Sequence, residues 1–451
     1  MNKKLGCIIL AAGKGNRMRS AVPKPLHKVA GRSMIGHVIA AAEALNPDKI
    51  VVVIGNDMEQ MAEAVKPHPT AIQPIANGTG GAALAAKDQF KNFDGDILIL
   101  FGDTPLVTTA TLQKMVDIRR QFPSIGLTFS GMQVTVPNTY GRMIMDDDGT
   151  LKKIVEFKDA STQEKNITLC NGGLVCADGA QLFKWLGQIG NHNAQKEYYL
   201  TDLPAIAKKD NRQTHAVEIS ANEIEGANSR VDLARLEKSA QQKLREKHML
   251  NGATLTDPET VYFSYDTVVG QDVTIGPNVF FGPNVNIASN VDILANCHIE
   301  GAEIGEGARI GPFARLRPHT KVGKEAKIGN FVETKNTYVG AGAKANHLSY
   351  LGDAEVGEKS NVGAGVVTCN YDGFFKYKTK IGKDVMVGSN ASLIAPVVIG
   401  NGAYIGAGSV ISKDVPDNAL GITRPPQVNK DGWAPEFRQK KIKEKSRKDG
   451  K

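Results

Sequence analysis

The segment DVTIGPNVFFGPNVNIASNVDI, residues 272–293, decides the fold of the C-terminal half of the chain. An apolar residue followed by a small one recurs every six residues, at Ile275-Gly276, Phe281-Gly282 and Ile287-Ala288. A short fixed period of this kind indicates a solenoid, in which each repeat stacks on its neighbours. Each step predicts one short strand with one inward aliphatic side chain, and three steps close one triangular coil.

The same period extends from about residue 263 to 410, which gives about 24 steps, or roughly eight coils. Steps of five residues are expected near 299, 334 and 351, and residues 372–380 read as an inserted loop. An ordinary sandwich of short strands would instead show spacings that vary between about 8 and 12 residues. The sequence therefore predicts an all-β parallel β-helix in this half.

The N-terminal half shows a different pattern, in which strand-like and helix-like runs alternate. Such alternation predicts an α/β domain around a mostly parallel sheet. The expected strands are residues 6–12, 50–54 and 97–101, and the expected helices are 34–45, 58–65, 80–90 and 111–122. Apolar residues at steps of three and four follow in 230–250, which predicts an amphipathic helix. We therefore expect an α/β domain at 1–229, a linker helix at 230–250, and a β-helix domain with a basic tail at 251–451.

Composition and charge narrow the class of protein. The chain has 451 residues, of which 41% are hydrophobic and 23% charged, as in ordinary globular proteins. No stretch near the start approaches the ~20 apolar residues of a membrane span. The net charge of +8 resides mostly in the segment 436–451, with eight basic and three acidic side chains, so we expect a solvated tail and no nucleic-acid partner.

The spacing of cysteines and histidines argues against a disulfide-stabilised protein and against a zinc enzyme. The five cysteines are odd in number and form no Cys-x-x-Cys pair, which favours a reducing, cytoplasmic compartment. A zinc site of the kind found in some hexapeptide-repeat enzymes would need three converging histidines. Neither the spacing of His298 and His319 nor that of His319 and His347 is a multiple of one coil of three hexapeptide steps. We therefore expect no zinc ion shared by these three histidines.

The loop after the first expected strand carries the first chemical signal. Glycines at 13 and 15 let main-chain N–H groups approach phosphate oxygens, while Lys14 and Arg17 add positive charge. The dinucleotide fingerprint would need a third glycine, which this loop lacks, and no Walker motif is present. Asp103 ends an aliphatic strand, where ligands bind in open α/β sheets, although Gly-Asp-Thr-Pro could also be a surface turn.

The Gly-x-Gly-x-Arg loop followed by Pro23-Lys24-Pro25 resembles the sugar-1-phosphate nucleotidyltransferases. Matching segments follow in order around Gln73, Asp103, Arg142, Glu156, Asn171, Tyr198 and Asn228. The resemblance implies a nucleotide and sugar site made of Leu10, Ala11, Ala12, Gly13, Lys24, Gln73, Gly78, Thr79, Phe101, Gly102, Asp103, Gly141, Glu156, Asn171 and Asn228. It further implies that Lys24 and Arg17 are catalytic cations, and that Asp103 and Asn228 bind Mg²⁺. In this interpretation Gln73, Gly78 and Thr79 contact the uracil of UTP, and Gly141, Glu156 and Asn171 hold the sugar.

A polar cluster interrupts the least regular coils of the expected solenoid, where packing gives no reason for it. It comprises Arg317, Glu333, Lys335, Asn346, His347, Tyr350, Asn361, Asn370, Tyr371 and Lys376. With both halves in the same order, from about Leu5 to Trp433, the chain resembles the bifunctional N-acetylglucosamine-1-phosphate uridylyltransferase/glucosamine-1-phosphate acetyltransferase family. In that family the second half is a left-handed parallel β-helix that forms a homotrimer, with acetyltransferase sites between subunits.

The resemblance implies a role for each residue of this second site. His347 is expected to act as the general base, because an imidazole changes protonation near neutral pH, and Glu333 to orient it. Phosphorylated amino sugar is expected at Arg317, Lys335, Tyr350, Asn361 and Lys376. Acetyl-CoA is expected at Ala364, Asn370, Tyr371, Ser389, Ala407 and Arg424.

The expected function is therefore acetylation of glucosamine-1-phosphate followed by uridylyl transfer from UTP. Two alternatives remain at this point. One is a single-activity nucleotidyltransferase whose solenoid only forms oligomers, and the other is a solenoid scaffold with a degenerate nucleotide-binding domain. Two residues depart from the family pattern beside the expected contacts: Gly81 replaces a common histidine, and Gly172 replaces the usual threonine.

Overall fold

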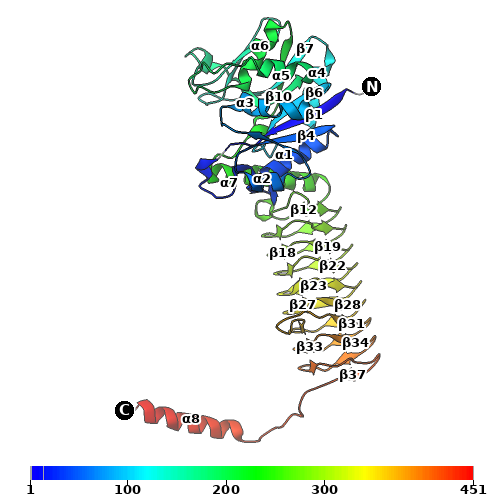
Figure 1. The fold of residues 1–451 in the computed structure, drawn as a ribbon. Coiled ribbons are helices and arrows are strands. Elements are labelled where there is room, and N and C mark those ends of the chain that lie inside the picture. The colour runs from blue at the N-terminus through cyan, green and yellow to red at the C-terminus, as the bar shows by residue number, and fades with distance from the viewer. Residues whose placement is uncertain (1–2, 14, 450–451) are drawn as a thin grey trace. The chain divides into compact units, whose positions relative to one another are not determined.

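The structure, a computed structural model, describes residues 3–13 and 15–449, so Lys14 lies outside the described residues. The chain forms two compact units (Figure 1). The first comprises the chain up to Leu250 together with Tyr262–Asp266. The second comprises Asn251–Val261 and the chain from Thr267 onward. No helix within the described ranges is long and apolar enough to cross a membrane.

One sheet forms the centre of the first unit, in the order β11-β7-β10-β6-β1-β4-β5. Strand β1 pairs in parallel with β4 and β6, whereas β10 runs antiparallel to β6 and β7. The strands are β1 (Lys4–Leu10), β4 (Lys49–Gly55), β5 (Thr70–Gln73), β6 (Gly95–Phe101), β7 (Ile125–Gln133), β8 (Arg142–Met145), β9 (Leu151–Val155), β10 (Leu169–Asp178) and β11 (Gln213–Glu218). A separate small hairpin joins β2 (Lys28–Val29) and β3 (Arg32–Ser33).

Helices cover both faces of this sheet, which explains why β1 and β6 are buried almost throughout. The helices are α1 (Met34–Glu43), α2 (Glu59–Ala64), α3 (Thr79–Ala85), α4 (Thr109–Gln121), α5 (Gly179–Leu186), α6 (Leu203–Lys209) and α7 (Arg230–Leu250). Short 3-10 turns complete the unit: η1 (Asn16–Met18), η2 (Lys24–Leu26), η3 (Lys87–Phe90), η4 (Glu164–Asn166), η5 (Leu200–Asp202) and η6 (Ala221–Ile224). Residues of α1 and α4 pack with Cys7, Ile9 and Leu98, whereas residues of α3, α5 and α6 pack with Ile8 and Ile97.

Helix α7 has the bounds that the apolar spacing predicts. Its buried Leu236 and Ala240 pack with Met34 and Leu106, both also in the first unit. Gln241 of this helix holds the segment Tyr262–Asp266, because its amide donates to the Phe263 carbonyl at 2.7 Å and accepts from the Phe263 N–H at 2.8 Å.

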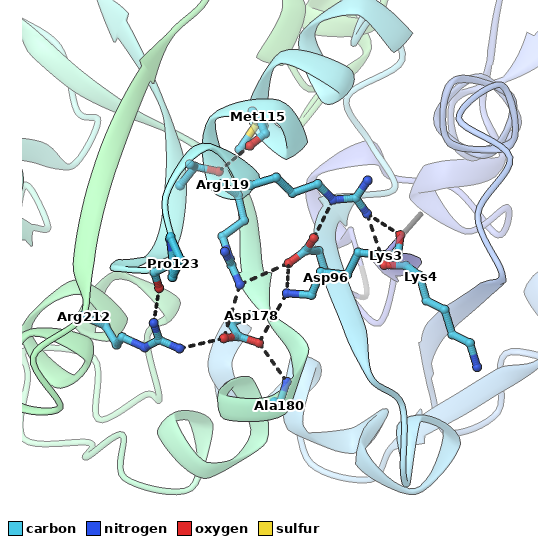
Figure 2. Close-up of polar contacts among 11 residues, drawn as sticks. Lys3, Lys4, Asp96, Met115, Arg119, Pro123, Asp178, Ala180 and Arg212 are labelled. Carbon is cyan, nitrogen blue, oxygen red and sulfur yellow. Dashed lines mark hydrogen bonds and ion pairs between the residues drawn. The ribbon is translucent and has the colours of Figure 1, made fainter. Parts of the chain in front are cut away.

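A buried ion network lies at the end of the sheet where β1 and β6 begin (Figure 2). The Asp96 side chain is fully buried and pairs with Arg119 at 3.2 Å, Arg120 at 2.7 Å and Lys3 at 3.1 Å. Arg119 also reaches Asp178 at 3.2 Å, so one guanidinium joins β6 to the end of β10. Each buried carboxylate therefore has cationic partners.

The second unit is a β-helix whose short parallel strands form three sheets, and its hexapeptide steps fit the left-handed form of this fold. The first sheet contains β12 (Thr254–Leu255), β14 (Thr274–Ile275), β17 (Asp292–Ile293), β20 (Arg309–Ile310), β23 (Lys327–Asn330), β26 (Lys344–His347), β29 (Asn361–Val362), β32 (Met386–Val387), β35 (Tyr404–Ile405) and β37 (Leu420–Gly421). The second contains β13 (Val268–Val269), β16 (Asn286–Ile287), β19 (Ala302–Ile304), β22 (Thr320–Val322), β25 (Tyr338–Val339), β28 (Ala354–Val356), β31 (Thr379–Ile381) and β34 (Val397–Ile399). The third contains β15 (Phe280–Phe281), β18 (His298–Ile299), β21 (Arg315–Leu316), β24 (Glu333–Lys335), β27 (Tyr350–Gly352), β30 (Val367–Cys369), β33 (Ser392–Ile394) and β36 (Val410–Ile411). The turn η7 (Pro258–Thr260) and the helix α8 (Trp433–Asp449) complete the unit.

Strand register confirms the predicted period and its irregularities. Val268 pairs with Asn286, so the coil between them has the regular three steps of six residues. The coil from Asn286 to its partner Glu303 is one residue shorter. Glu355 pairs with Lys380, so the coil that carries the inserted loop is seven residues longer than the regular one. Strands extend beyond the recognisable repeat of residues 263–410, from Thr254 to Gly421, and all of them lie within residues 251–451.

The positive φ angles mark the corners of the coils. Asp272, Asn278, Asn284, Asn290 and Asn296 all have φ between 56° and 62°, six residues apart, and these residue types tolerate that conformation best after glycine. The corners at Gly301, Asn336 and Asp353 each follow the previous corner after five residues. These three short steps lie where the sequence predicts them.

The Asp96 network generates a prediction about stability. Asp96→Ala removes the carboxylate that Arg119, Arg120 and Lys3 share, and we expect it to lower the free energy of unfolding of the first unit by about 3–5 kcal/mol. Urea unfolding followed by fluorescence of the buried Trp185 measures this change. Asp94→Ala, at an exposed position two residues earlier, is the matched control, and equal effects of the two substitutions would contradict the prediction.

Candidate active sites

The first candidate site is a cavity of about 270 Å³ in the first unit, at the end of β1 and β6 opposite the Asp96 network. Ten of the predicted nucleotide-site residues line it: Leu10, Ala11, Ala12, Gly13, Lys24, Gln73, Gly78, Thr79, Phe101 and Asp103. Pro25, Ala76, Ala82 and Glu197 complete the lining. The strand ends of a parallel sheet thus bring together residues that are far apart in sequence.

Lys24 is the centre of charge in this cavity. Its ammonium lies 2.5 Å from Asp103 Oδ2 and donates a 2.8 Å hydrogen bond to Asn228 Oδ1. The turn η2 carries Lys24 close to the glycine loop, because a Cβ at Gly15, where φ is +60°, would lie 2.5 Å from the Lys24 Cβ. Positive φ and this close approach both require glycine at position 15.

The same geometry tests whether Mg²⁺ fits. One cationic atom, Lys24 Nζ, already lies within 2.8 Å of oxygens from both Asp103 and Asn228. One carboxylate and one amide oxygen converge there, which is the small set of oxygen ligands that Mg²⁺ uses together with phosphates. These two residues therefore fit the ion, although no group of three or more His, Cys, Asp or Glu side chains suited to a metal occurs among the described residues.

The predicted sugar residues converge beside the cavity. A Cβ at Gly141 would lie 3.5 Å from Glu156 Oε2 and 3.6 Å from Asn171 Cβ. The Asn171 N–H donates to the Gly141 carbonyl at 2.8 Å. Burial raises the pKa of the Glu156 carboxyl, and nearby Asp159 and Asp202 raise it further, while a hydrogen bond from Thr201 lowers it.

Thr201 and Thr79 connect these residues to the cavity. The Thr201 hydroxyl donates to Glu156 Oε1 at 3.2 Å, and the N–H of Leu200 donates to Thr79 Oγ1 at 3.1 Å. Of the remaining predicted residues, Gly102 binds through its N–H to the Leu10 carbonyl at 2.9 Å. Arg17 lies exposed on η1 and is not among the residues that line the cavity.

The second candidate site lies in the β-helix. Arg317 donates to Glu333 Oε1 at 2.9 Å, one coil apart. A hydrogen bond and charge repulsion from Lys376 lower the pKa of Lys335, and Arg317 contributes to the same shift. Three cations thus gather around one exposed region, and such a concentration of positive charge favours an anionic ligand.

His347 lies on strand β26, which belongs to a different sheet from β24 and its Glu333. Its Nδ1 is 2.6 Å from Oδ1 of Asn330, which is paired with it in register one coil earlier. Glu333, expected to orient this imidazole, instead accepts from Arg317. A cation is a strong partner for a carboxylate, and within one chain the hydrogen-bond partner of His347 Nδ1 is Asn330.

Three of the six residues predicted for acetyl-CoA form a row along the β-helix. The pairing of Val362 with Val387 and of Val387 with Ile405 puts Ala364, Ser389 and Ala407 at equivalent positions of successive coils. Arg424 donates to the Ala407 carbonyl at 2.9 Å. The Asn370 amide donates to the Asp353 carboxylate at 2.5 Å. The backbone of Tyr371 pairs with that of Lys376 as an isolated antiparallel β-bridge in the inserted loop. Of the predicted sugar-phosphate residues, Tyr350 pairs with Glu333 in register, and Asn361 donates to the Met386 sulfur at 3.3 Å.

Comparison with known proteins identifies the family. The Bifunctional protein GlmU of Paramagnetospirillum magneticum is 48% identical to this chain, over 99% of this chain and 100% of its own. Those of Rhodospirillum rubrum and Rhizorhabdus wittichii are 51% and 50% identical, over 96% and 99% of this chain and 97% and 100% of theirs. The chain belongs to the GlmU family. The family model of the MobA-like NTP transferase domain matches residues 7–144, and that of the bacterial transferase hexapeptide (six repeats) matches 301–336 and 378–413.

Membership of the GlmU family confirms the resemblance seen in the sequence and the fold class of both halves. Sequence reasoning missed Asn330, Asp353 and Glu197 as site residues. Asn330 could have been found, because it precedes His347 by one coil. Asp353 accepts hydrogen bonds from Asn336 and Asn370 of neighbouring coils, and Glu197 lines the cavity from a loop far in sequence from the strand ends, so spacing along the chain reveals neither contact.

Glu156 generates a prediction about pH. Because folding raises the pKa of this carboxyl, the folded state favours its protonated form. The resulting destabilisation is absent below the ordinary carboxyl pKa of about 4.3 and fully present above the raised folded value. Glu156→Gln should therefore raise the apparent Tm of the first unit at pH 7 by roughly 1–3 °C. Calorimetry at pH 7 and near pH 4 measures this gain, which should vanish at the lower pH; a gain that is equal at both pH values would exclude this cause.

Proposed function

We propose that the chain is a cytoplasmic enzyme with two sites, one in each unit. The second site transfers the acetyl group of acetyl-CoA to glucosamine-1-phosphate. The first site then joins the product, N-acetylglucosamine-1-phosphate, to UTP, which gives UDP-N-acetylglucosamine and pyrophosphate. The observation that carries this proposal is the presence, in one chain of the GlmU family, of the Lys24 cavity and of His347 beside a cationic cluster.

In the first site the sugar phosphate attacks the α-phosphorus of UTP and pyrophosphate leaves. Lys24 and the amides of the glycine loop neutralise the charge that develops on the phosphates. Mg²⁺ held by Asp103 and Asn228 would add Lewis-acid stabilisation of the same charge. Glu156, Asn171 and Gly141 hold the sugar, while Gln73, Gly78 and Thr79 contact the uracil. Arg17, exposed on its turn, adds positive charge that attracts the phosphates.

In the second site the sugar amine attacks the thioester carbonyl of acetyl-CoA. With Asn330 Oδ1 as acceptor, Nδ1 of His347 carries hydrogen and Nε2 presents a lone pair. Nε2 takes the proton of the amine as the C–N bond forms and the C–S bond breaks, and CoA leaves as the thiol. Lys335, Lys376 and Arg317 bind the phosphate, Glu333 holds Arg317 in position, and Tyr350 and Asn361 contact the sugar. The row Ala364, Ser389 and Ala407, with Asn370, Tyr371 and Arg424, forms the acetyl-CoA groove.

A single-activity nucleotidyltransferase does not fit this chain. A solenoid used only for oligomers would need neither the His347–Asn330 pair nor a cluster of three mutually repelling cations. The relatives named as bifunctional proteins also align over both halves.

Substitutions in the two units should separate the activities. Asp103→Ala should abolish uridylyl transfer and spare acetylation, while His347→Ala should lower acetylation by about 100-fold or more and spare uridylyl transfer. Mass spectrometry follows the products formed from glucosamine-1-phosphate, acetyl-CoA, UTP and Mg²⁺, with each component omitted in turn. UDP-N-acetylglucosamine should require all of them. If wild-type protein forms it only from N-acetylglucosamine-1-phosphate supplied directly, the role of His347 is refuted.

We also propose a homotrimer formed through the β-helix. Phe313, Phe331 and Leu348 occupy corners of successive coils and are 48%, 56% and 60% exposed, and such an exposed apolar row favours burial against another copy. Leu348 adjoins His347, so the row borders the second site. Light scattering should give three times the mass of one 48.4 kDa chain, and a monomeric mass would contradict both the trimer and a site between subunits.

A further inference from the structure

The Gln73 amide in the first site is held in one orientation. Gln73 is buried, with 7% of its surface exposed, and it lines the cavity. Its side-chain nitrogen lies 3.2 Å from the Gly78 carbonyl and 3.0 Å from Asn77 Oδ1. A main-chain carbonyl can only accept, so the atom facing Gly78 is Nε2. Both hydrogens of Nε2 are then engaged, and Oε1 is the atom of this amide that can face a ligand.

The Asn77 side chain owes its position to Gly81. A Cβ at Gly81 would lie 1.9 Å from Asn77 Oδ1 and 2.7 Å from its Cγ, so the amide occupies the space that any larger residue would fill. Gly81 has no positive φ, which means that space, not backbone conformation, requires glycine here.

The backbone around Asn77 is fixed independently. The Tyr198 N–H donates to the Asn77 carbonyl at 2.8 Å, and the Gly80 N–H donates to the Tyr198 carbonyl at 2.8 Å. Gly78, with φ of +107°, packs so closely that its Cβ would lie 2.5 Å from the Tyr198 carbonyl oxygen. The remaining freedom near Gln73 therefore lies in the Asn77 side chain.

We propose that Asn77, lying over Gly81, is a positioning residue that fixes the Gln73 amide with its carbonyl toward the nucleobase and thereby selects uracil over cytosine. This inference rests on the proposed function, in which Gln73 contacts the base of UTP. Uracil offers an N3–H donor to Oε1, whereas N3 of cytosine is an acceptor. An amide free to turn would present Nε2 to cytosine, and an anchored one presents an unpaired acceptor, which discriminates against the wrong base.

Substitutions at two positions test the anchor. Asn77→Ala should lower the preference for UTP over CTP in kcat/KM by about tenfold, because Gln73 then turns to suit either base. Asn77→Asp keeps an acceptor for Nε2 and should retain the preference. Gly81→Ala should act like Asn77→Ala by displacing the amide, and it should cause no further loss when added to Asn77→Ala.

A matched substrate separates base reading from general damage to the site. 5-Methyl-UTP has the same N3–H and O4 edge as UTP, so its ratio to UTP should be equal in the wild-type protein and in every variant. An altered ratio, or an additional loss from Gly81→Ala in the Asn77→Ala background, would mean that the substitutions act through helix α3 and would overturn the proposal.

The preference is measured both as binding of UTP and CTP by calorimetry and as the rate of UDP-N-acetylglucosamine formation. A wild-type preference in binding that Asn77→Ala abolishes, without any product formed, would refute the proposed function and support the role of Asn77. Equal preference in wild type and Asn77→Ala, with product formed by both, would refute the role of Asn77 and leave the function intact.

Discussion

The second unit depends on one backbone constraint, a residue with positive φ at most corners of the coil. The corner redirects the chain every five or six residues, and from β13 to β30 it keeps the coils at 17 or 18 residues. Because coils of nearly equal length stack in register, residues one coil apart stand in straight rows. Asn330 lies beside His347, and Ser389 aligns with Ala407, for this reason. Ala364 joins the same row although the inserted loop makes the coil between it and Ser389 seven residues longer. The geometry of the second site is thus a consequence of the corners rather than of any local motif.

In the first unit, the ends of parallel strands bring the residues of the site together. Parallel β1 and β6 end together at Leu10 and Phe101, so the loops that follow them meet. Lys24 then joins these loops to Asn228, which lies just before α7. This arrangement concentrates charged side chains at the C-terminal ends of β1 and β6. At the opposite ends of these strands, the Asp96 network pairs each carboxylate with cations. The sheet is therefore polarised, with a ligand-binding end and a structural end.

Properties that repeat locally could be predicted from the sequence, and contacts between distant segments could not. The six-residue period and its three short steps follow from residue type alone, and α7 follows from apolar spacing. The β-helix domain was expected from residue 251, but the six-residue repeat does not show the first coil, around Leu255, because no glycine follows this leucine. The antiparallel direction of β10 has no signature in its apolar run. The ion pair of Glu333 with Arg317 joins neighbouring coils, and no local pattern predicts it. Thr201 reaches Glu156 from a separate turn, which no spacing could reveal.

The departure at Gly172 illustrates why a single residue cannot be judged alone. A Cβ at this position would lie 2.5 Å from Ser130 Oγ on β7. That hydroxyl accepts a 3.0 Å hydrogen bond from the Leu174 N–H, where the register between β10 and β7 shifts. A larger residue at 172 would displace the hydroxyl and with it the irregular stretch of β10 that begins at Asn171. Gly172 and Ser130 are therefore coupled, because the Ser130 side chain on the neighbouring strand occupies the space that a side chain at position 172 would fill. The sugar-binding geometry proposed for Asn171 depends on the pair, so the missing threonine by itself says little about affinity.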